Sequence, residues 1–161
     1  MSELELAYRR CFPVIREKCR RMLGDAGAAD DVAQETFMKL WKSRFVDADP
    51  RTLAAWVYRT STRLAIDQLR ERARRAGEGD VAEEMASAEP RPDDALAMRQ
   101  ILERLAAVLP RQELEIALLH RLDELTQQEI ARVAEVSART VRRCLRRLEQ
   151  RLEMLRKEII R

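Results

Sequence analysis

One segment limits what this chain can fold into. Residues 77–94 read GEGDVAEEMASAEPRPDD, with seven carboxylates, one arginine and almost no large apolar side chain. Such a segment cannot bury enough apolar surface to offset the conformational entropy that ordering costs. The sequence therefore predicts a flexible acidic linker at 77–94, which divides the 161 residues into a domain at 1–76 and a domain at 95–161. Each part is short enough to form one small domain.

Both parts have the pattern of helical proteins. The chain contains only 4 Gly and 5 Pro, and its commonest residues, Leu, Ala, Glu and Arg, favour helices. Apolar residues recur at helical spacing. We expect helices at about 3–23 (ended by Gly24), 29–43 (with Asp30 and Asp31 in its first turn), 52–75, 95–108 and 111–122, then two shorter helices and a long final one. The predicted fold class is all-α, with two small helical domains.

The charges are distributed unevenly. Residues 1–76 carry 16 Lys and Arg against 11 Asp and Glu, residues 77–94 carry 1 against 7, and residues 95–161 carry 14 against 10. Two basic parts joined by an acidic tether suit a polyanionic partner such as nucleic acid. Two ordinary domains with a solvated linker would give the same distribution.

Several functional classes lack the residues they need. Cys11, Cys19 and Cys144 form no CxxC pair and His120 is the single histidine, so the spacing supports no metal site. No Ser/His/Asp set and no Gly-rich phosphate loop is present, so we predict no enzyme and no cofactor. We see neither a signal peptide nor an apolar stretch long enough to cross a bilayer, and we expect a cytoplasmic protein without a membrane span.

The strongest local signal lies at 125–148, which reads LTQQEIARVAEVSARTVRRCLRRL. Thr126 and Glu129 have the spacing of a capping box, which begins a short helix. Ser137 is a second N-cap, and the helix after it has one apolar stripe, at Val141, Leu145, Leu148, Leu152 and Leu155. Glu135 stands in the turn, where φ is often positive and Gly is preferred, at a cost of about 1 kcal/mol.

The helix after Ser137 has an arginine-rich polar face. Its arginines fall at i, i+3, i+4 and i+7, so they form one patch. A short helix, a tight turn and an arginine-rich second helix are typical of the helix-turn-helix, in which arginines pair with guanine or phosphate. The predicted DNA-binding residues are Ser137, Arg139, Thr140, Arg142, Arg143 and Arg146. The alternative is an amphipathic helix with a solvated basic face.

A second signal lies in the predicted helix at 52–75. An aromatic residue shares one face with a stripe of arginines, at Trp56, Arg59, Arg63, Asp67, Arg70 and Arg74. Rings that stack on bases and arginines that neutralise phosphates suit single-stranded DNA. In the alternative interpretation, Trp56 packs inside the domain and the arginines are solvated.

The predicted helix at 29–43 differs, because its exposed side is acidic and polar, with Asp30, Asp31, Gln34, Glu35 and Lys39. Its apolar stripe comprises Val32, Ala33, Phe37, Leu40 and Trp41. Such a face suits docking on a basic partner helix rather than DNA. A simple solvated face is the alternative.

Three segments resemble one family. DDVAQETFMKLW (30–41) resembles the core-polymerase-binding helix of sigma region 2, and AWVYRTSTRLAIDQLR (55–70) resembles its promoter-melting helix. The segment from LPRQELEIALLHRLDEL to TVRRCLRRL (109–148) resembles sigma region 4. Their order, spacing and acidic linker are similar to extracytoplasmic-function (group 4) sigma factors of the sigma-70 family.

The resemblance implies a function and a role for each surface. The chain would bind core RNA polymerase and direct promoter-specific transcription initiation, recognising −10 and −35 promoter elements and aiding DNA melting. The residues that would dock on polymerase are Asp31, Gln34, Glu35 and Phe37. Trp56, Arg59, Arg63, Asp67 and Arg70 would meet the −10 element. The −35 element would be met by the predicted helix-turn-helix residues Ser137, Arg139, Thr140, Arg142, Arg143 and Arg146.

The resemblance also implies how such a chain is used and where this one differs. The linker would thread through the polymerase, and an anti-sigma factor is a possible partner. Arg63 stands where the family commonly has Asn, which favours phosphate contact over base reading. Glu124 and Glu135 stand where Gly is frequent.

One competing hypothesis is an ordinary helix-turn-helix regulator whose N-terminal part dimerises or senses a ligand. The segment 30–41 discriminates between the two, since a dimerising domain needs no acidic docking face of this kind.

Overall fold

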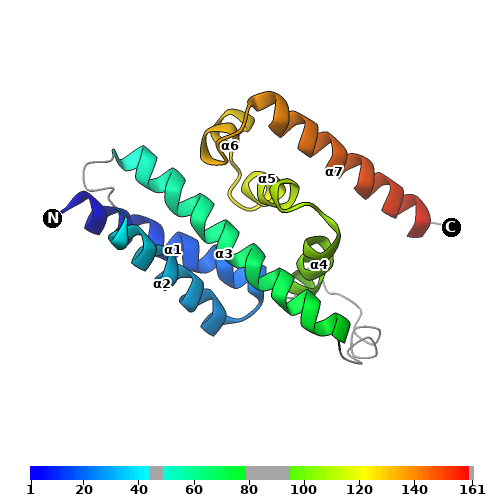
Figure 1. Ribbon diagram of the computed structural model, residues 1–161, viewed down its shortest axis with the longest axis horizontal. Helices are drawn as coiled ribbons and strands as arrows, with labels where there is room; N and C mark the ends of the chain where they lie inside the picture. Colours follow the sequence, from blue (N-terminus) through cyan, green and yellow to red (C-terminus); the bar gives the residue numbers. More distant parts are fainter. Residues whose placement is uncertain (44–48, 79–94, 160–161) are drawn as a thin grey trace. The chain divides into compact units, whose positions relative to one another are not determined.

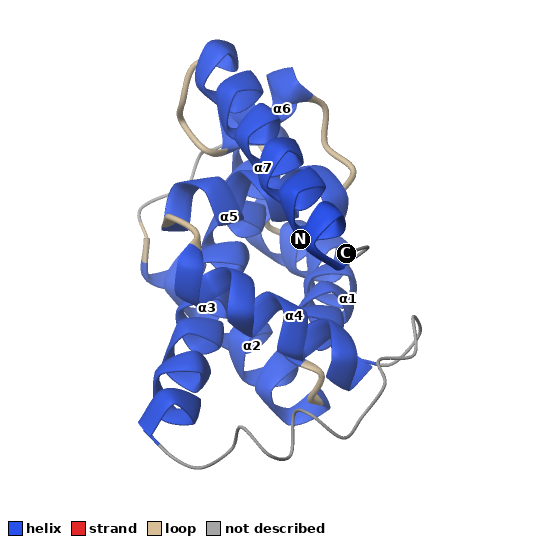
Figure 2. Ribbon diagram, turned by 90° about the vertical axis from the view of Figure 1, so that its right-hand side faces the viewer, coloured by secondary structure: helices blue, strands red, loops and turns tan. Residues whose placement is uncertain are grey.

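The structure is a computed structural model that describes residues 1–43, 49–78 and 95–159. Every regular element in these ranges is an α-helix (Figures 1 and 2), which confirms the predicted fold class. The helices are α1 (Glu3–Leu23), α2 (Ala26–Lys42), α3 (Pro50–Glu78), α4 (Ala95–Val108), α5 (Arg111–Arg121), α6 (Gln127–Val133) and α7 (Ala138–Ile159). They form two compact units, unit 1 from Met1 to Leu109 and unit 2 from Pro110 onward. Among the described residues, no helix combines the length and the apolar character that a membrane span requires.

Capping residues set the ends of the first two helices. Gly24 ends α1 in the left-handed conformation (φ 63°), as the sequence predicts. Asp25 then accepts hydrogen bonds from the backbone of Gly27 (2.8 Å) and Ala28, so α2 begins at Ala26 rather than near residue 29. The prediction that Asp30 and Asp31 lie in the first turn is therefore wrong, because the cap lies earlier than expected and places both in the second turn.

Unit 1 is built around α1. This helix packs against α2, α3 and α4, and α2 also contacts α3 (Figure 1). Burying one apolar stripe from each helix supplies the main stabilisation of such a unit. The largest side chains of its core are Ile15, Met22, Leu23, Phe37, Leu40, Leu53, Ile66 and Leu69.

A buried lysine crosses this core. The Lys18 ammonium of α1 donates to the Thr62 hydroxyl of α3 (2.8 Å) and to the Tyr58 carbonyl (3.4 Å), and it lies 5.4 Å from the Tyr58 ring centre. A buried cation is tolerated only where acceptors replace its water shell. These bonds therefore fix α3 against α1 in one rotation about its axis.

The position of α4 differs from the sequence-based expectation. The sequence grouped 95–108 with the C-terminal helices, whereas α4 packs against α1 and α3 and belongs to unit 1. It buries Ala97, Leu102 and Ala106, and Leu109 directly after it is also buried, while Met98 and Ile101, which fall on its second apolar side, are exposed. Periodicity alone does not say which of two apolar sides is covered.

The predicted linker is only partly within the described structure. Its first two positions, 77 and 78, form the end of α3, so the helix continues beyond the predicted end at 75. Residues 79–94 lie outside the described residues.

Unit 2 consists of α5, α6 and α7, which contact one another. The expected two shorter helices and a final long one are instead one short helix and one long one, because the helix after Ser137 continues to Ile159. Its apolar stripe is unbroken, so nothing ends the helix earlier. The stripe buries Val141, Cys144 and Leu148, while Leu145 is partly buried.

The turn between α6 and α7 has the expected strained residue. Glu135 has φ 54°, and Glu124, before α6, has φ 52°. The Val136 N–H donates to the Ala131 carbonyl (3.0 Å) and the Glu135 N–H to the Arg132 carbonyl (3.4 Å), the pattern of a Schellman C-cap. The helix end thus requires a left-handed residue that Glu adopts at a cost.

We predict that Glu135→Gly stabilises unit 2 by about 1 kcal/mol over Glu135→Ala, because glycine adopts the left-handed conformation without a Cβ clash. Both variants lose the same side-chain interactions, so their difference isolates the backbone strain. Urea unfolding followed by circular dichroism measures it. Equal stability of the two variants would contradict a strained turn.

Candidate nucleic-acid interface

Among the described side chains of α7, six arginines are exposed, and two of them, Arg147 and Arg151, form ion pairs with Glu113 of α5. Arg139, Arg142, Arg143 and Arg146 are all exposed, on one side of the N-terminal half of the helix. The exposed, one-sided patch that the sequence predicts is therefore present. An exposed cluster of guanidinium groups beside a helix N-terminus is favourable for phosphate and for base edges.

The start of α7 is fixed by a cap. The Thr140 N–H donates to the Ser137 hydroxyl (3.1 Å), and the two hydroxyl oxygens are 3.0 Å apart. The Ser137 side chain therefore orders the helix end on which the arginines stand. At the other end of the motif, Thr126 and Glu129 form the predicted capping box of α6.

A buried carboxylate of α5 forms ion pairs with α7. Glu113, in the first turn of α5, is only 6% exposed, and its oxygens lie 3.4 Å from Arg147 and 4.0 Å from Arg151. A buried carboxylate needs such partners, and the helix N-terminus adds to their effect. Burial, and then the Glu113 charge, raise the pKa of the neighbouring Cys144 thiol. Arg147 and Arg151 thus neutralise the Glu113 carboxylate while their side chains stay about half exposed, and within the described part of the chain no such ion pair is seen for the other four.

The predicted −10 residues follow one side of α3. Trp56, Arg59 and Arg63 are partly buried and Asp67 is exposed. Arg70 is also partly buried, because its guanidinium donates to the Leu109 carbonyl (3.3 Å) at the end of α4. This face is therefore less open than the sequence suggested.

The predicted docking face of α2 is confirmed as exposed at three of its four positions. Asp31, Gln34 and Glu35 are exposed. Phe37 is only 1% exposed and packs against the rings of Tyr8 (5.1 Å) and Phe12 (5.8 Å). Its assignment to the docking surface is wrong, because α1 covers it.

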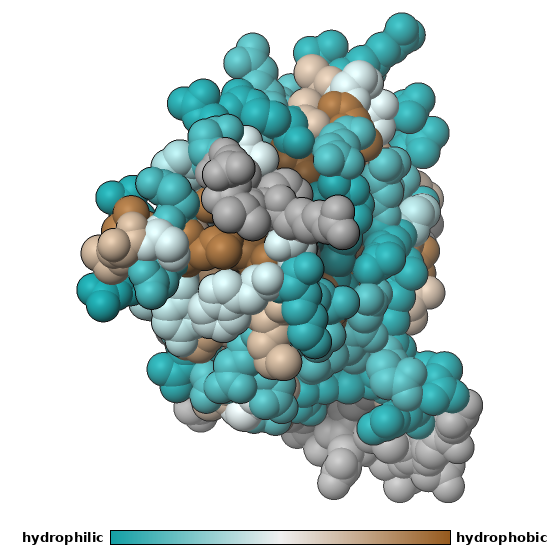
Figure 3. Space-filling view, turned by 60° about the vertical axis from the view of Figure 1, so that its left-hand side comes forward, coloured by the Kyte–Doolittle hydropathy of each residue, from teal (hydrophilic) through white to brown (hydrophobic). Residues whose placement is uncertain are grey.

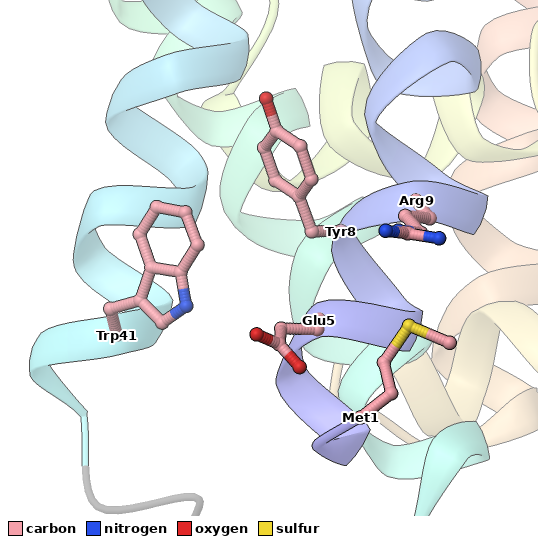
Figure 4. Close-up of a pocket in the computed structure, with 5 residues that line it drawn as sticks. All are labelled: Met1, Glu5, Tyr8, Arg9 and Trp41. Carbon is pink, nitrogen blue, oxygen red and sulfur yellow. The ribbon is translucent and has the colours of Figure 1, made fainter.

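Two exposed apolar residues extend the same face. Met38 is 52% and Trp41 51% exposed, although the sequence placed Trp41 on the buried stripe. The Trp41 ring stacks on Tyr8 at 5.6 Å beside a hollow of about 320 Å³ that Glu5, Arg9 and Met1 also line (Figure 4). Most of the surface in the view of Figure 3 is hydrophilic, and neighbouring exposed apolar side chains on such a surface can mark an interaction site. The helical spacing of the apolar residues did not predict that the Trp41 side chain would be exposed.

Comparison with known proteins finds a matching family model for each of two parts of the chain. The family model for sigma-70 region 2 matches residues 7–75, and that for sigma-70 region 4 matches residues 99–152. The RNA polymerase sigma factor CnrH of Cupriavidus metallidurans is 30% identical over 138 residues, which cover 78% of this chain and 72% of that protein. The chain belongs to the sigma-70 family of RNA polymerase sigma factors.

Further relatives place this sigma factor in the extracytoplasmic-function group. The ECF RNA polymerase sigma factor SigW of Bacillus subtilis is 29% identical over 157 residues, covering 90% of this chain and 82% of the relative. The probable RNA polymerase sigma factor RfaY of Xanthomonas campestris is 30% identical over 130 residues, covering 76% of this chain but 32% of the relative. The function is promoter-specific transcription initiation, and an ordinary helix-turn-helix regulator would not account for the region 2 match.

We predict that Glu113→Gln destabilises the sigma factor by about 1–3 kcal/mol, since the amide loses charge-assisted contacts to Arg147 and Arg151 while it remains buried. Urea unfolding followed by circular dichroism measures the loss. Glu149→Gln, at an exposed position of α7, is the matched control and should change stability little. Equal stability of the Glu113 and Glu149 variants would show that the buried carboxylate does not hold α7.

Proposed function

We propose that α7 reads the −35 element through the arginines of its N-terminal half, with Ser137 and Thr140 at the helix start. The observation that carries this proposal is that Arg139, Arg142, Arg143 and Arg146 form one exposed group on the N-terminal half of α7, whereas Arg147 and Arg151, although also exposed, form ion pairs with Glu113. An arginine can pair bidentately with guanine or with phosphate, so the patch can supply both reading and affinity. The residues are Ser137, Arg139, Thr140, Arg142, Arg143 and Arg146.

Region 2 supplies the second DNA contact in this proposal. Its α3 residues Trp56, Arg59, Arg63, Asp67 and Arg70 meet the −10 element and aid melting. Aromatic stacking with neighbouring cations is the chemistry that single-stranded DNA requires. Arg63 stands where the family commonly has Asn. We assign it a contact with phosphate rather than with a base edge, because a guanidinium forms strong charge-assisted hydrogen bonds to phosphate.

The α2 face docks on core RNA polymerase. Asp31, Gln34 and Glu35 supply polar and acidic groups for a basic partner surface, and Met38 and Trp41 supply an apolar centre. Phe37 supports this face from inside, through its packing on α1.

The remaining roles follow from this assignment. Sigma factors are non-catalytic initiation factors, and we assign every chemical step to the polymerase and none to this chain. We place the protein in the cytoplasm, where its polymerase acts. An anti-sigma factor that competes for the α2 face is a further partner consistent with the group.

We predict that Arg142→Ala and Arg143→Ala each weaken −35 DNA binding by about 1–3 kcal/mol, because each removes a guanidinium contact to base or phosphate. Binding of the holoenzyme to duplex promoter DNA, and run-off transcription from it, measure the effect. Core binding should be unchanged. Lys157→Ala, an exposed cation near the end of α7, is the charge-matched control. Loss of core binding in the arginine variants would mean that the patch contacts polymerase instead.

We predict the reverse pattern for the α2 face. Trp41→Ala should weaken core binding by about 2 kcal/mol, as loss of an aromatic interface residue commonly does, and Glu35→Lys should weaken it through charge repulsion. Titration of labelled sigma factor with core polymerase measures both. Glu3→Lys, an equal charge reversal on α1, is the control. Core affinity as in the wild type for both α2 variants would refute this docking face.

A further inference from the structure

The side of α7 that lies opposite its buried stripe carries a line of arginines over the first three turns. Val141 and Leu148 are buried where α7 packs on α5 and α6. In a helix with about 3.6 residues per turn, the positions opposite them are Arg139, Arg143 and Arg146, at i, i+4 and i+7. All three are exposed. Packing by the stripe therefore points this line directly away from unit 2.

The fourth exposed arginine of this half lies to one side of the line. Arg142 is three positions after Arg139 and one before Arg143, so it projects from the flank of the helix. When a helix lies in the major groove, its outermost line faces the base edges and its flanks face the phosphates of the two strands. A guanidinium on the flank is therefore placed to contact phosphate.

Distance from the start of the helix separates the three arginines of the line. Arg139 is the second residue of α7, and Arg143 lies one turn later. Arg146 lies about 10 Å along the axis from Arg139. Base edges are contacted by the N-terminal residues of a recognition helix, because that end enters the groove. Arg139 and Arg143 are thus placed to reach bases, whereas Arg146 lies where the helix leaves them.

The other polar groups of the motif discriminate poorly between bases. The Ser137 hydroxyl accepts the Thr140 N–H (3.1 Å), and the two hydroxyl oxygens lie 3.0 Å apart, so both groups take part in the helix cap. A hydroxyl can also either donate or accept. Residues 138–148 include no Asn, Gln, Asp or Glu, the side chains that select adenine or cytosine. Gln127 and Gln128 begin α6, and the first helix of this motif crosses the phosphate backbone.

We propose that Arg139 and Arg143 each read a guanine of the −35 element through O6 and N7, and that Arg142 and Arg146 hold phosphates beside them. Guanine is the base that presents two acceptors together in the major groove, and a guanidinium can donate to both. The two readers lie about 6 Å apart along the helix, so we expect the two guanines within about two base pairs of each other. The inference rests on the proposed role of α7 at the −35 element and adds which bases that helix selects.

The first test selects promoters from a DNA library that is randomised at both elements, with holoenzyme reconstituted from core polymerase and the full chain. The wild type should select guanine at two nearby −35 positions. Arg139→Ala should lose the preference at one of them and Arg143→Ala at the other, each by about tenfold relative to the other bases. Arg139→Lys should lose the preference as well, because an ammonium keeps the charge but cannot pair bidentately.

Arg142→Ala and Arg146→Ala are the matched controls, since they remove the same charge from exposed positions of the same helix. They should weaken binding to all sequences alike and reduce the salt dependence of binding, with base preferences as in the wild type. Guanine preferences that persist in both Arg139→Ala and Arg143→Ala overturn the proposal. Base preferences that change equally in all four alanine variants overturn it too.

The second test changes the DNA and leaves the protein as it is. On a selected promoter duplex, 7-deazaguanine at either predicted position removes N7 and keeps the base pair. It should weaken binding of the wild-type holoenzyme by about tenfold. At the position that Arg139 reads, the same replacement should have no effect on the Arg139→Ala holoenzyme. Unchanged wild-type binding to both modified duplexes overturns the proposal.

Failure of the guanine contacts and failure of the −35 role give different results. If Arg139→Ala and Arg143→Ala weaken binding to every sequence alike, α7 still contacts the −35 element and only the guanine reading fails. If all four alanine variants bind and transcribe every selected promoter as the wild type does, the −35 role of α7 fails and the inference fails with it.

Discussion

The buried Glu113 carboxylate ties α7 to α5 through ion pairs with Arg147 and Arg151. A buried charge is costly unless oppositely charged groups come to it, and Arg147 and Arg151 are the two that do. The apolar stripe through Val141 and Leu148 favours the same rotation of the helix. Because packing and electrostatics agree, α7 has one rotation, in which Arg139, Arg142, Arg143 and Arg146 are exposed. The surface proposed to read DNA is thus positioned by the buried apolar stripe and by the Glu113 ion pairs beside it.

Unit 1 uses a buried charge of the opposite sign in a similar way. Lys18 of α1 donates to Thr62 and to the Tyr58 carbonyl, both on α3. Only one rotation of α3 satisfies that amine, and in it Trp56, Arg59, Arg63 and Arg70 are partly buried rather than in the core. In both units, then, a buried ion on an earlier helix helps to orient the helix that carries the arginines proposed to bind DNA. Apolar stripes alone permit small rotations, whereas a buried ion with fixed acceptors does not.

The sequence predicted those features that depend on local chemistry. The ends of α1, the capping box of α6, the cap at Ser137 and the positive φ of Glu135 each require only neighbouring residues. The features it missed depend on contacts between distant segments. Phe37 and Trp41 lie one turn apart on α2, and only the positions of Tyr8 and Phe12 on α1 decide that the first is buried and the second exposed.

The same limit explains the misplaced α4. A helix with apolar residues on two sides can pack against a neighbour on either side, and the spacing of its residues does not rank the two sides. In the structure, Ala97, Leu102 and Ala106 are buried where α4 packs on α1 and α3, while Met98 and Ile101 stay exposed. The covered side is therefore chosen by α1 and α3, which are distant in sequence, because the pattern of α4 alone fits both choices.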